Sequence, residues 1–333
     1  MSEPTPLRFM EAVNGFQRTA VVRAAVELDF FTAVAAGADT PGALAIRLGI
    51  AQKGARVLAD SLVILGLMEK RDGRYTLVEE SAIFLDRRSP RYLGGVIDFL
   101  LSEPVRHGYS RLTDAVRQGG TAVGGEGSLA PEHPMWVEFA RVMGPLLLTA
   151  VQTIVEVTTP AGDVLDVASG HGRFGIALLE SGAARTATAL DWPNVLELAR
   201  ANAEAAGVLD RWRALPGNAL TADLGGPYDT VLLPNFLHHF DADTCRGILM
   251  RVHASLRTGG RVVVVEYLPD DTRVSPSAAA WFAVQMLATT PAGDAYTLAE
   301  YTEFLGAAGF TEPSVHKVPG AARHVLVAER RVR

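Results

Sequence analysis

The segment VLDVASGHGRFG, residues 164–175, decides the fold of this 333-residue chain. Its first four residues, Val164–Val167, have the pattern of a buried strand, and helical residues follow from Phe174. Three glycines between them have the spacing G-x-G-x-x-G, which is typical of loops that approach a nucleotide at a helix N-terminus. We therefore expect a cofactor with a nucleotide part at this loop.

Alternating strands and helices continue to the end of the chain. Further strands are predicted at Ala187–Leu190, Tyr228–Leu233, Val262–Val265, Val315–Val318 and His324–Ala328. Helices are predicted at Phe174–Leu179, Val195–Ala206 and Asp243–Leu256, and from a capping box at Thr297 to Ala308. Strands that alternate with helices, one of them apolar throughout, predict an α/β fold with a doubly wound, mostly parallel sheet.

The first third of the chain predicts helices followed by a hairpin. Apolar residues recur at helical spacing over 9–31, Thr40-Pro41 has the form of a helix start, and a second helix is expected over 52–65. Asp72-Gly73 between two short apolar runs predicts a hairpin turn. This order is the winged-helix arrangement.

A winged helix raises the question of DNA binding. The candidate recognition helix carries Lys53, Arg56 and Asp60 but is otherwise mostly apolar. A helix that reads DNA needs several polar side chains that reach base edges. The pattern therefore favours a structural or dimerisation role over a DNA-binding regulator.

Composition and charge narrow the class of protein. The chain has 31 Lys and Arg against 37 Asp and Glu, a formal net charge of −6, which argues against a wholly basic nucleic-acid surface. A single cysteine, Cys245, excludes a disulfide framework. We see no basic-then-apolar leader at the N-terminus, and Gln152 and Glu156 interrupt the apolar run around Leu146. We expect a soluble, cytoplasmic protein that spans no membrane.

The predicted domains are a winged-helix-like unit over 1–98, a helical connector over 99–157 and a nucleotide-binding domain over 158–333. The connector contains a glycine-rich loop over 119–127, the breakers Pro131 and Pro134, and a helix from Met135. The apolar stripe on that helix is Trp136, Phe139, Ala140 and Met143.

Two aspartates help to choose the cofactor. Asp191, at the end of the second strand, could accept the ribose hydroxyls of several nucleotides, so it does not discriminate. Asp166, before the glycines, would repel the pyrophosphate of a nicotinamide dinucleotide. It suits a cofactor with a cationic group, such as the ammonium of S-adenosylmethionine (SAM).

With these residues in place, the chain resembles the SAM-dependent O-methyltransferases of the caffeate and hydroxyindole type, which include bacterial natural-product enzymes. The resemblance covers nearly the whole chain. The blocks that carry it are Asp166–Gly172, Asp191–Val195, Gly217–Leu220, Leu237–Asp241 and Val265–Pro269.

The resemblance implies a Rossmann-like class I methyltransferase domain, a homodimer formed through the N-terminal domain, and a small-molecule substrate. It also implies that the cofactor is SAM and the product S-adenosylhomocysteine. The matched cofactor-binding residues are Asp166, Gly170, Gly172, Asp191, Trp192, Gly217, Asn218, Ala219 and Leu220.

The same resemblance gives His238 the role of general base. It would take the proton of a substrate hydroxyl as that oxygen attacks the methyl group, a task that suits a histidine pKa. Glu266 matches the carboxylate that holds the imidazole in its useful tautomer. His239 is the poorer candidate, and no cluster at ligand spacing indicates a metal.

Seven residues match the substrate pocket of the family: Phe139, Met143, Asn235, Trp281, Gln285, Met286 and Thr290. Apolar, aromatic and methionine side chains suit a flat, largely hydrophobic substrate, here a small aromatic or polyketide-like metabolite.

Three positions depart from the family pattern. Asn218 stands where an aspartate is usual, and Pro234-Asn235 replaces a Lys-Trp pair. Ala295 stands where relatives carry a glutamate beside the catalytic histidine, and Asp294 is adjacent. The last departure leaves two alternatives within the family, C-methylation of the substrate and SAM binding without methyl transfer. Two alternatives outside the family also remain: a nicotinamide-dependent dehydrogenase that uses the G-x-G-x-x-G loop, and a ligand-sensing DNA-binding regulator.

Overall fold

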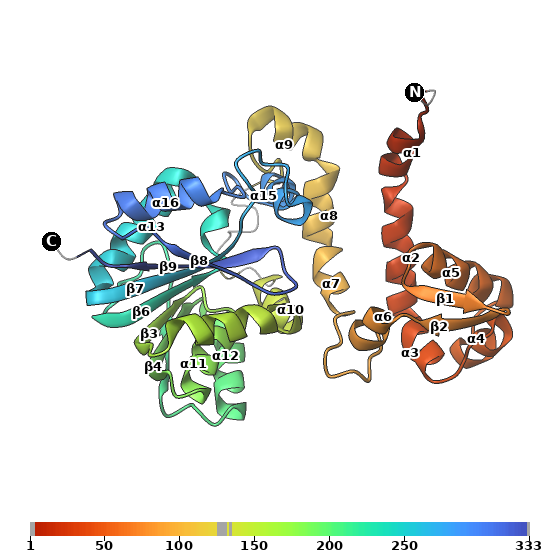
Figure 1. Cartoon of the computed structure of the whole chain (residues 1–333), viewed down its shortest axis with the longest axis horizontal. Coiled ribbons are helices and arrows are strands. Elements are labelled where there is room, and N and C mark those ends of the chain that lie inside the picture. The colour runs from red at the N-terminus through yellow and green to blue at the C-terminus, as the bar shows by residue number, and fades with distance from the viewer. Residues whose placement is uncertain (1–3, 125–131, 133–134, 332–333) are drawn as a thin grey trace. The chain divides into compact units, whose positions relative to one another are not determined.

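The structure is a computed structural model that describes residues 4–124, 132 and 135–331. Gly125, Glu126 and Gly127 of the predicted glycine-rich loop lie outside the described residues, as do Pro131 and Pro134. The chain forms two compact units, residues 1–98 and 99–333 (Figure 1).

The first unit is helical with one hairpin. Its elements are α1 (Leu7–Val13), α2 (Gly15–Glu27), α3 (Phe30–Ala35), α4 (Pro41–Leu48), α5 (Gln52–Ile64), β1 (Met68–Arg71), β2 (Arg74–Leu77) and α6 (Glu79–Phe84). The predicted start of α4 is confirmed, because the Thr40 side chain accepts a hydrogen bond from the backbone N–H of Ala43. The hairpin is confirmed as well, since β1 and β2 pair antiparallel around Asp72-Gly73.

The second unit is an α/β domain with additional helices. Its helices are α7 (Val96–Leu100, which begins before the boundary), α8 (Glu103–Ser110), α9 (Leu112–Gln118), α10 (Met135–Thr158), α11 (Arg173–Glu180), α12 (Pro193–Ala205), α13 (Ala242–Ser255), α14 (Ser277–Ala280), α15 (Phe282–Thr289) and α16 (Leu298–Ala307). Its strands are β3 (Gly162–Val167), β4 (Ala184–Asp191), β5 (Trp212–Pro216), β6 (Tyr228–Pro234), β7 (Leu256–Tyr267), β8 (Ser314–Lys317) and β9 (Arg323–Glu329).

The sheet has the order β5-β4-β3-β6-β7-β9-β8. The strands from β5 to β7 are parallel, and β9 and β8 are antiparallel additions, so the predicted mostly parallel sheet is confirmed. From β3 the strand order runs outward through β4 on one side and through β6 on the other. Loops diverge at such a switch point, and they leave a crevice outside the carboxyl ends of the strands.

Alternate residues of the sheet enter two different cores. On β7, Val262 and Val264 pack with α13 and α16, whereas Val263 and Val265 pack with α10, α11 and α12 (Figure 1). All four valines are fully buried, as a strand covered on both faces requires. The two helical layers fix the carboxyl ends of the strands and therefore the loops that follow them.

Helix α10 is more apolar than the sequence prediction allowed. By length and composition its 24 residues could cross a membrane. In the structure, however, Leu147, Ala150 and Ile154 are buried in the core formed with α11 and α12. The helix is packed as a core element of the α/β domain.

Candidate functional site

A cavity of about 440 Å³ lies at the carboxyl ends of the central strands, within the second unit. The loops after β3, β4 and β5 form one part of its lining, and the loop after β6 with helices α10 and α15 forms another. This is the crevice that the switch point between β3 and β6 predicts.

The glycine loop after β3 lines the cavity with Ala168, Ser169, Gly170 and His171. Gly170 has a φ of 56°, and its N–H donates to Oδ2 of Asp191 at 2.8 Å. Ser169 Oγ is buried without a hydrogen-bond partner in the described chain. The loop therefore lines the cavity, while the hydroxyl of Ser169 is itself buried.

Asp191 joins this loop to the end of β4. Its second oxygen accepts the N–H of Trp192 at 2.7 Å, and burial raises the pKa of its carboxyl to about 6. Each oxygen keeps a further lone pair for a ligand hydroxyl. Other predicted cofactor residues line the same part of the cavity: Trp192, Gly217, Asn218, Ala219 and Leu220.

Two predicted cofactor residues lie off the cavity wall. Gly172 faces α12, where an added Cβ would lie 3.1 Å from that of Ala199. Asp166 is 1% exposed beneath the loop, and its Oδ2 accepts the N–H of Gly175 at 3.1 Å. Burial raises the pKa of Asp166 to about 8. The structure thus gives Asp166 a contact with the first turn of α11 instead of a place on the lining.

The turn after β6 positions His238. Asn235 adopts a φ of 54°, its N–H donates to the carbonyl of Val265 on β7, and a short 3₁₀ helix, η2 (Leu237–His239), follows. Asp241 then caps α13 by accepting the N–H of Thr244 at 2.7 Å. The histidine therefore lies between two anchored points and lines the cavity.

Glu266 lies behind His238 and is fully buried. Its Oε2 lies 2.5 Å from Nδ1 of His238, while its Oε1 accepts the backbone N–H groups of Phe236 at 3.1 Å and His238 at 3.3 Å. When Nδ1–H donates to the carboxylate, the lone pair of a neutral imidazole is on Nε2.

Burial sets the protonation of this pair. It lowers the pKa of His238 to about 3 and raises that of Glu266 to about 8. The backbone N–H groups and Arg323 act against the rise at Glu266, because both favour its charged form. The imidazole is therefore neutral at pH 7, and ionisation of Glu266 selects the tautomer with a free Nε2.

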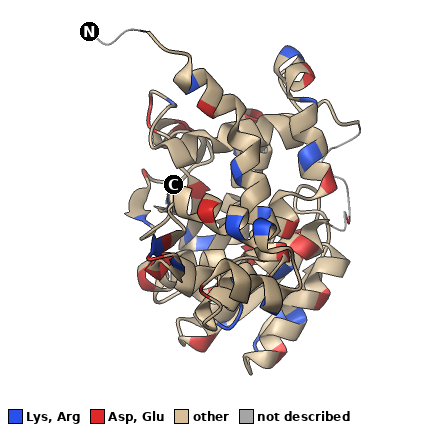
Figure 2. Ribbon diagram, turned by 90° about the vertical axis from the view of Figure 1, so that its right-hand side faces the viewer, with Lys and Arg blue, Asp and Glu red and all other residues tan. Residues whose placement is uncertain are grey.

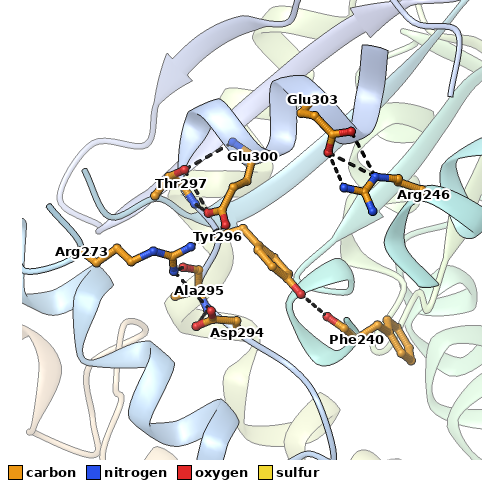
Figure 3. A network of polar contacts seen from close by, with 9 residues as sticks. All are labelled: Phe240, Arg246, Arg273, Asp294, Ala295, Tyr296, Thr297, Glu300 and Glu303. Atoms are coloured by element: carbon orange, nitrogen blue, oxygen red, sulfur yellow. Dashed lines mark hydrogen bonds and ion pairs between the residues drawn. The ribbon is translucent and has the colours of Figure 1, made fainter. Parts of the chain in front are cut away.

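The segment around Ala295 supports His238 without a second carboxylate on its ring. Figure 3 shows this segment, with Asp294 beside Arg273. Asp294 donates its backbone N–H to the carbonyl of His238 at 3.0 Å, but its side chain contacts Arg273 at 3.2 Å and the N–H of Ala295 at 2.7 Å. Ala295 is buried at 1% exposure. Asp294 thus fixes the backbone of the histidine and does not contact the imidazole.

Gly293 lies against this backbone, so Gly293→Ala should disturb the site. A Cβ at this position would lie 2.3 Å from the carbonyl oxygen of His238 and 2.6 Å from Oγ1 of Thr290. We expect the free energy of unfolding to fall by about 1–3 kcal/mol, as for other overpacked positions. We expect kcat to fall with it, since the turn that holds His238 must shift. Thermal unfolding and steady-state kinetics measure the two effects.

Gly306→Ala is the matched control. Gly306 lies in α16, and a Cβ there would meet nothing within 4 Å. Alanine in a helix is about 0.5–1 kcal/mol more favourable than glycine, so this variant should be at least as stable as the parent. Equal kinetics for Gly293→Ala and the parent would contradict a supporting role for this segment.

Five of the seven predicted pocket residues line the cavity: Phe139, Met143, Asn235, Gln285 and Met286. The other two do not. Trp281 is 70% exposed, and Thr290 is buried with its hydroxyl donating to the carbonyl of Met286 at 2.7 Å. Trp136, predicted as part of an apolar stripe, also lines the cavity, and its ring meets that of His239 edge-on.

Sequence reasoning missed several cavity residues: His171, Tyr267, Phe282, Thr244 and Arg323. The spacing of the glycine loop pointed to His171, which lies between its first two glycines. Tyr267 follows Glu266 directly and stacks on Phe282 with ring centroids 4.1 Å apart. No sequence signal pointed to Arg323, because it reaches the site only through the antiparallel pairing of β9 with β7.

Comparison with known families identifies the class of protein. Residues 137–311, more than half of the chain, match the O-methyltransferase domain, and residues 10–87 match the O-methyltransferase dimerisation domain. The chain belongs to the O-methyltransferase family. The prediction of a SAM-dependent methyltransferase, with a helical dimerisation domain before an α/β domain, is confirmed.

Individual relatives agree with this assignment. The chain is 33% identical to 3-hydroxy-5-methyl-1-naphthoate 3-O-methyltransferase of Streptomyces sahachiroi, over 92% of this chain and 90% of the relative. It is 29% identical to the tetracenomycin polyketide synthesis 8-O-methyl transferase of Streptomyces glaucescens, over 95% and 94%. A candidate O-methyltransferase structure from Nostoc punctiforme is similar with 43% identity and a TM-score of 0.94, over 98% and 100%.

Proposed function

We propose that this protein transfers the methyl group of SAM to a hydroxyl of a small aromatic or polyketide-like metabolite, with His238 as general base. The observation that carries the proposal is the buried contact of 2.5 Å between Nδ1 of His238 and Glu266. It leaves a neutral imidazole on the wall of a cavity that the cofactor loops also line.

The residues present fit SAM. The glycine loop and Asp191 line the same part of the cavity. A carboxylate that accepts ribose hydroxyls, beside the amide of Asn218 for the adenine side, suits a neutral nucleoside better than a pyrophosphate. When bound there, SAM supplies a methyl group made electrophilic by its sulfonium.

The protein's own residues perform the acid–base step. Glu266 accepts Nδ1–H of His238, and Nε2 takes the proton of the substrate hydroxyl as its oxygen becomes the nucleophile. Phe139, Met143 and Met286 line the same cavity with apolar atoms, which disfavour water beside the substrate. This arrangement needs no metal ion.

The lining favours a flat hydrophobic substrate. Phe99 and Trp136 each meet Phe139 edge-on, with ring centroids 5.0 and 5.8 Å apart. Aromatic walls of this kind suit fused or single aromatic rings. The relatives named above act, by their names, on a naphthoate and in tetracenomycin polyketide synthesis, which supports the same class of substrate here.

Product analysis tests the reaction type. The enzyme is incubated with SAM carrying a ¹³C-labelled methyl group and a panel of hydroxylated naphthalenes and benzenes, and the labelled product is examined by NMR. An O-methyl product supports the proposal, whereas a C-methyl product supports the C-methyltransferase alternative. Calorimetric titration with SAM and with NADH separates the dehydrogenase alternative; binding of NADH without SAM would overturn the proposal.

We further propose a cytoplasmic homodimer that forms through the N-terminal unit and binds no nucleic acid or membrane. Ile46, Val57 and Ile64 of that unit are exposed apolar side chains on α4 and α5. Arg56, a residue of the candidate DNA-reading helix, pairs with Asp60 at 3.1 Å. Basic and acidic residues are intermixed over the molecule in Figure 2, which argues against a DNA-binding face.

SAM binding should weaken below about pH 6. Asp191 has a pKa raised to about 6 by burial, and its charged form is the better acceptor of ribose hydroxyls. As the pH falls through this value the carboxyl takes up a proton, so Kd should rise by up to about tenfold per pH unit. Calorimetry between pH 5 and 8 measures this, with Asp191→Asn as the variant that should bind weakly at every pH. A parent Kd that does not change over this range would contradict the role of Asp191.

A further inference from the structure

Arg323 is a buried cation on the wall of the cavity. It is the first residue of β9 and pairs in register with Tyr267 at the end of β7. The residue is 8% exposed, and its guanidinium carbon lies 4.4 Å from the centroid of the Tyr267 ring. Its Nε donates to Oδ1 of Asn235 at 3.1 Å.

The direct partners of this guanidinium are neutral. In the described part of the chain they are the Asn235 amide and the Tyr267 ring, and no carboxylate lies within ion-pair distance. Glu266 interacts with Arg323 by longer-range charge–charge attraction, without a hydrogen bond or ion pair. A buried charge is costly unless a counter-charge and hydrogen bonds compensate it, so the terminal nitrogens of Arg323 have bonding capacity to spare.

The position of Arg323 assigns it to the substrate part of the cavity. The cofactor loops follow β3, β4 and β5, whereas Arg323 lies beside β6 and β7, on the other side of the switch point. Tyr267 connects it to His238, because Tyr267 stacks on Phe282 and Phe282 meets the His238 ring with centroids 4.7 Å apart. Among the described lining residues it is the only lysine or arginine.

We infer that Arg323 binds a carboxylate of the substrate, so that the metabolite methylated here is an aromatic hydroxy acid. This inference rests on the proposed function for the acceptor hydroxyl at His238. A guanidinium presents a planar pair of donors that matches a carboxylate, and the match is strongest where water is excluded. A rigid ring that carries both groups would thereby be oriented with its hydroxyl toward the imidazole.

Ligand binding tests the inference without any methyl transfer. The full-length protein is loaded with S-adenosylhomocysteine and titrated calorimetrically with hydroxybenzoic and hydroxynaphthoic acid isomers and with the methyl ester of each. We expect at least one acid to bind about 10- to 100-fold more tightly than its ester, since only the acid offers a charge-assisted partner. Arg323→Gln should remove this preference, and Arg323→Lys should keep part of it.

Two controls make the result specific. Arg213→Gln removes the same charge from an exposed position on β5 and should leave the preference unchanged. The affinity for S-adenosylhomocysteine reports whether the Arg323→Gln protein is folded. If no acid binds better than its ester, or if Arg323→Gln weakens acid and ester equally, Arg323 serves the structure alone and the inference is overturned. Absence of methyl transfer with a retained acid preference would instead contradict only the proposed function.

Discussion

Replacement of His238 by asparagine should lower kcat by about 10²- to 10⁴-fold, the usual contribution of a general base. The imidazole lines the cavity, and Glu266 orients it from behind through a contact of 2.5 Å. Asparagine keeps a polar side chain at this place but has no group that takes a proton near neutral pH. Steady-state kinetics with an excess of SAM measures the loss, and calorimetry should show an unchanged Kd for SAM.

His239→Asn is the matched control. His239 is the adjacent histidine and also lines the cavity, but its Nδ1 is buried without a partner among the described residues, so no carboxylate orients it. Burial and the neighbouring imidazole lower its pKa far below the usual value. We expect an effect mainly on KM. Full turnover by His238→Asn would remove the general base from the mechanism and favour transfer to carbon.

Helices and strands could be predicted from the sequence where the segment itself contains a capping motif or an apolar pattern. Thr297 and Glu300 form the predicted capping box of α16, and each makes the expected reciprocal hydrogen bond. Strand β5 was missed, because Trp212–Pro216 is an edge strand with mostly exposed residues and lacks an apolar run. Its position became evident only from its pairing with β4.

Residues of the candidate site could be predicted where they match the motifs of the family. His238 and Glu266 were predicted as a pair, and the structure brings them together. The sequence did not show which side chains near α15 face the cavity. Gln285 and Met286 line it, whereas Trp281, just before α15, faces solvent. Arg323 was not predicted, because its place depends on the register of β9 against β7.

Glu266→Gln should inactivate the enzyme through the tautomer of His238. The carbonyl oxygen of glutamine must occupy the place of Oε1, where it accepts the N–H groups of Phe236 and His238. The amide NH₂ then replaces Oε2 and donates to Nδ1 of His238. The proton of the neutral imidazole is forced onto Nε2, which can no longer act as a base, and kcat should fall by about 10²- to 10⁴-fold.

The activity and stability of the parent should depend on pH in a way that those of Glu266→Gln do not. Burial raises the pKa of Glu266 to about 8, and only its ionised form accepts Nδ1–H, so the activity of the parent should rise with pH toward this value. Because folding raises the pKa of Glu266 from 4.5 to about 8, the folded parent holds this proton more tightly than the unfolded chain, so its stability should fall as the pH rises from about 4.5 to about 8 and level off above. Glu266→Gln has no such ionisation, so its activity should be low and independent of pH, and its Tm should fall less than that of the parent between about pH 4.5 and 8.

A double variant distinguishes this mechanism from damage to the fold. If Glu266 acts through His238, the variant with both His238→Asn and Glu266→Gln should be no slower than His238→Asn alone, because the second change removes a function that is already lost. Independent, multiplying losses would show that Glu266 acts elsewhere. A parent activity that does not change between pH 6 and 9 would likewise contradict the proposed ionisation, since the useful tautomer would then exist at every pH.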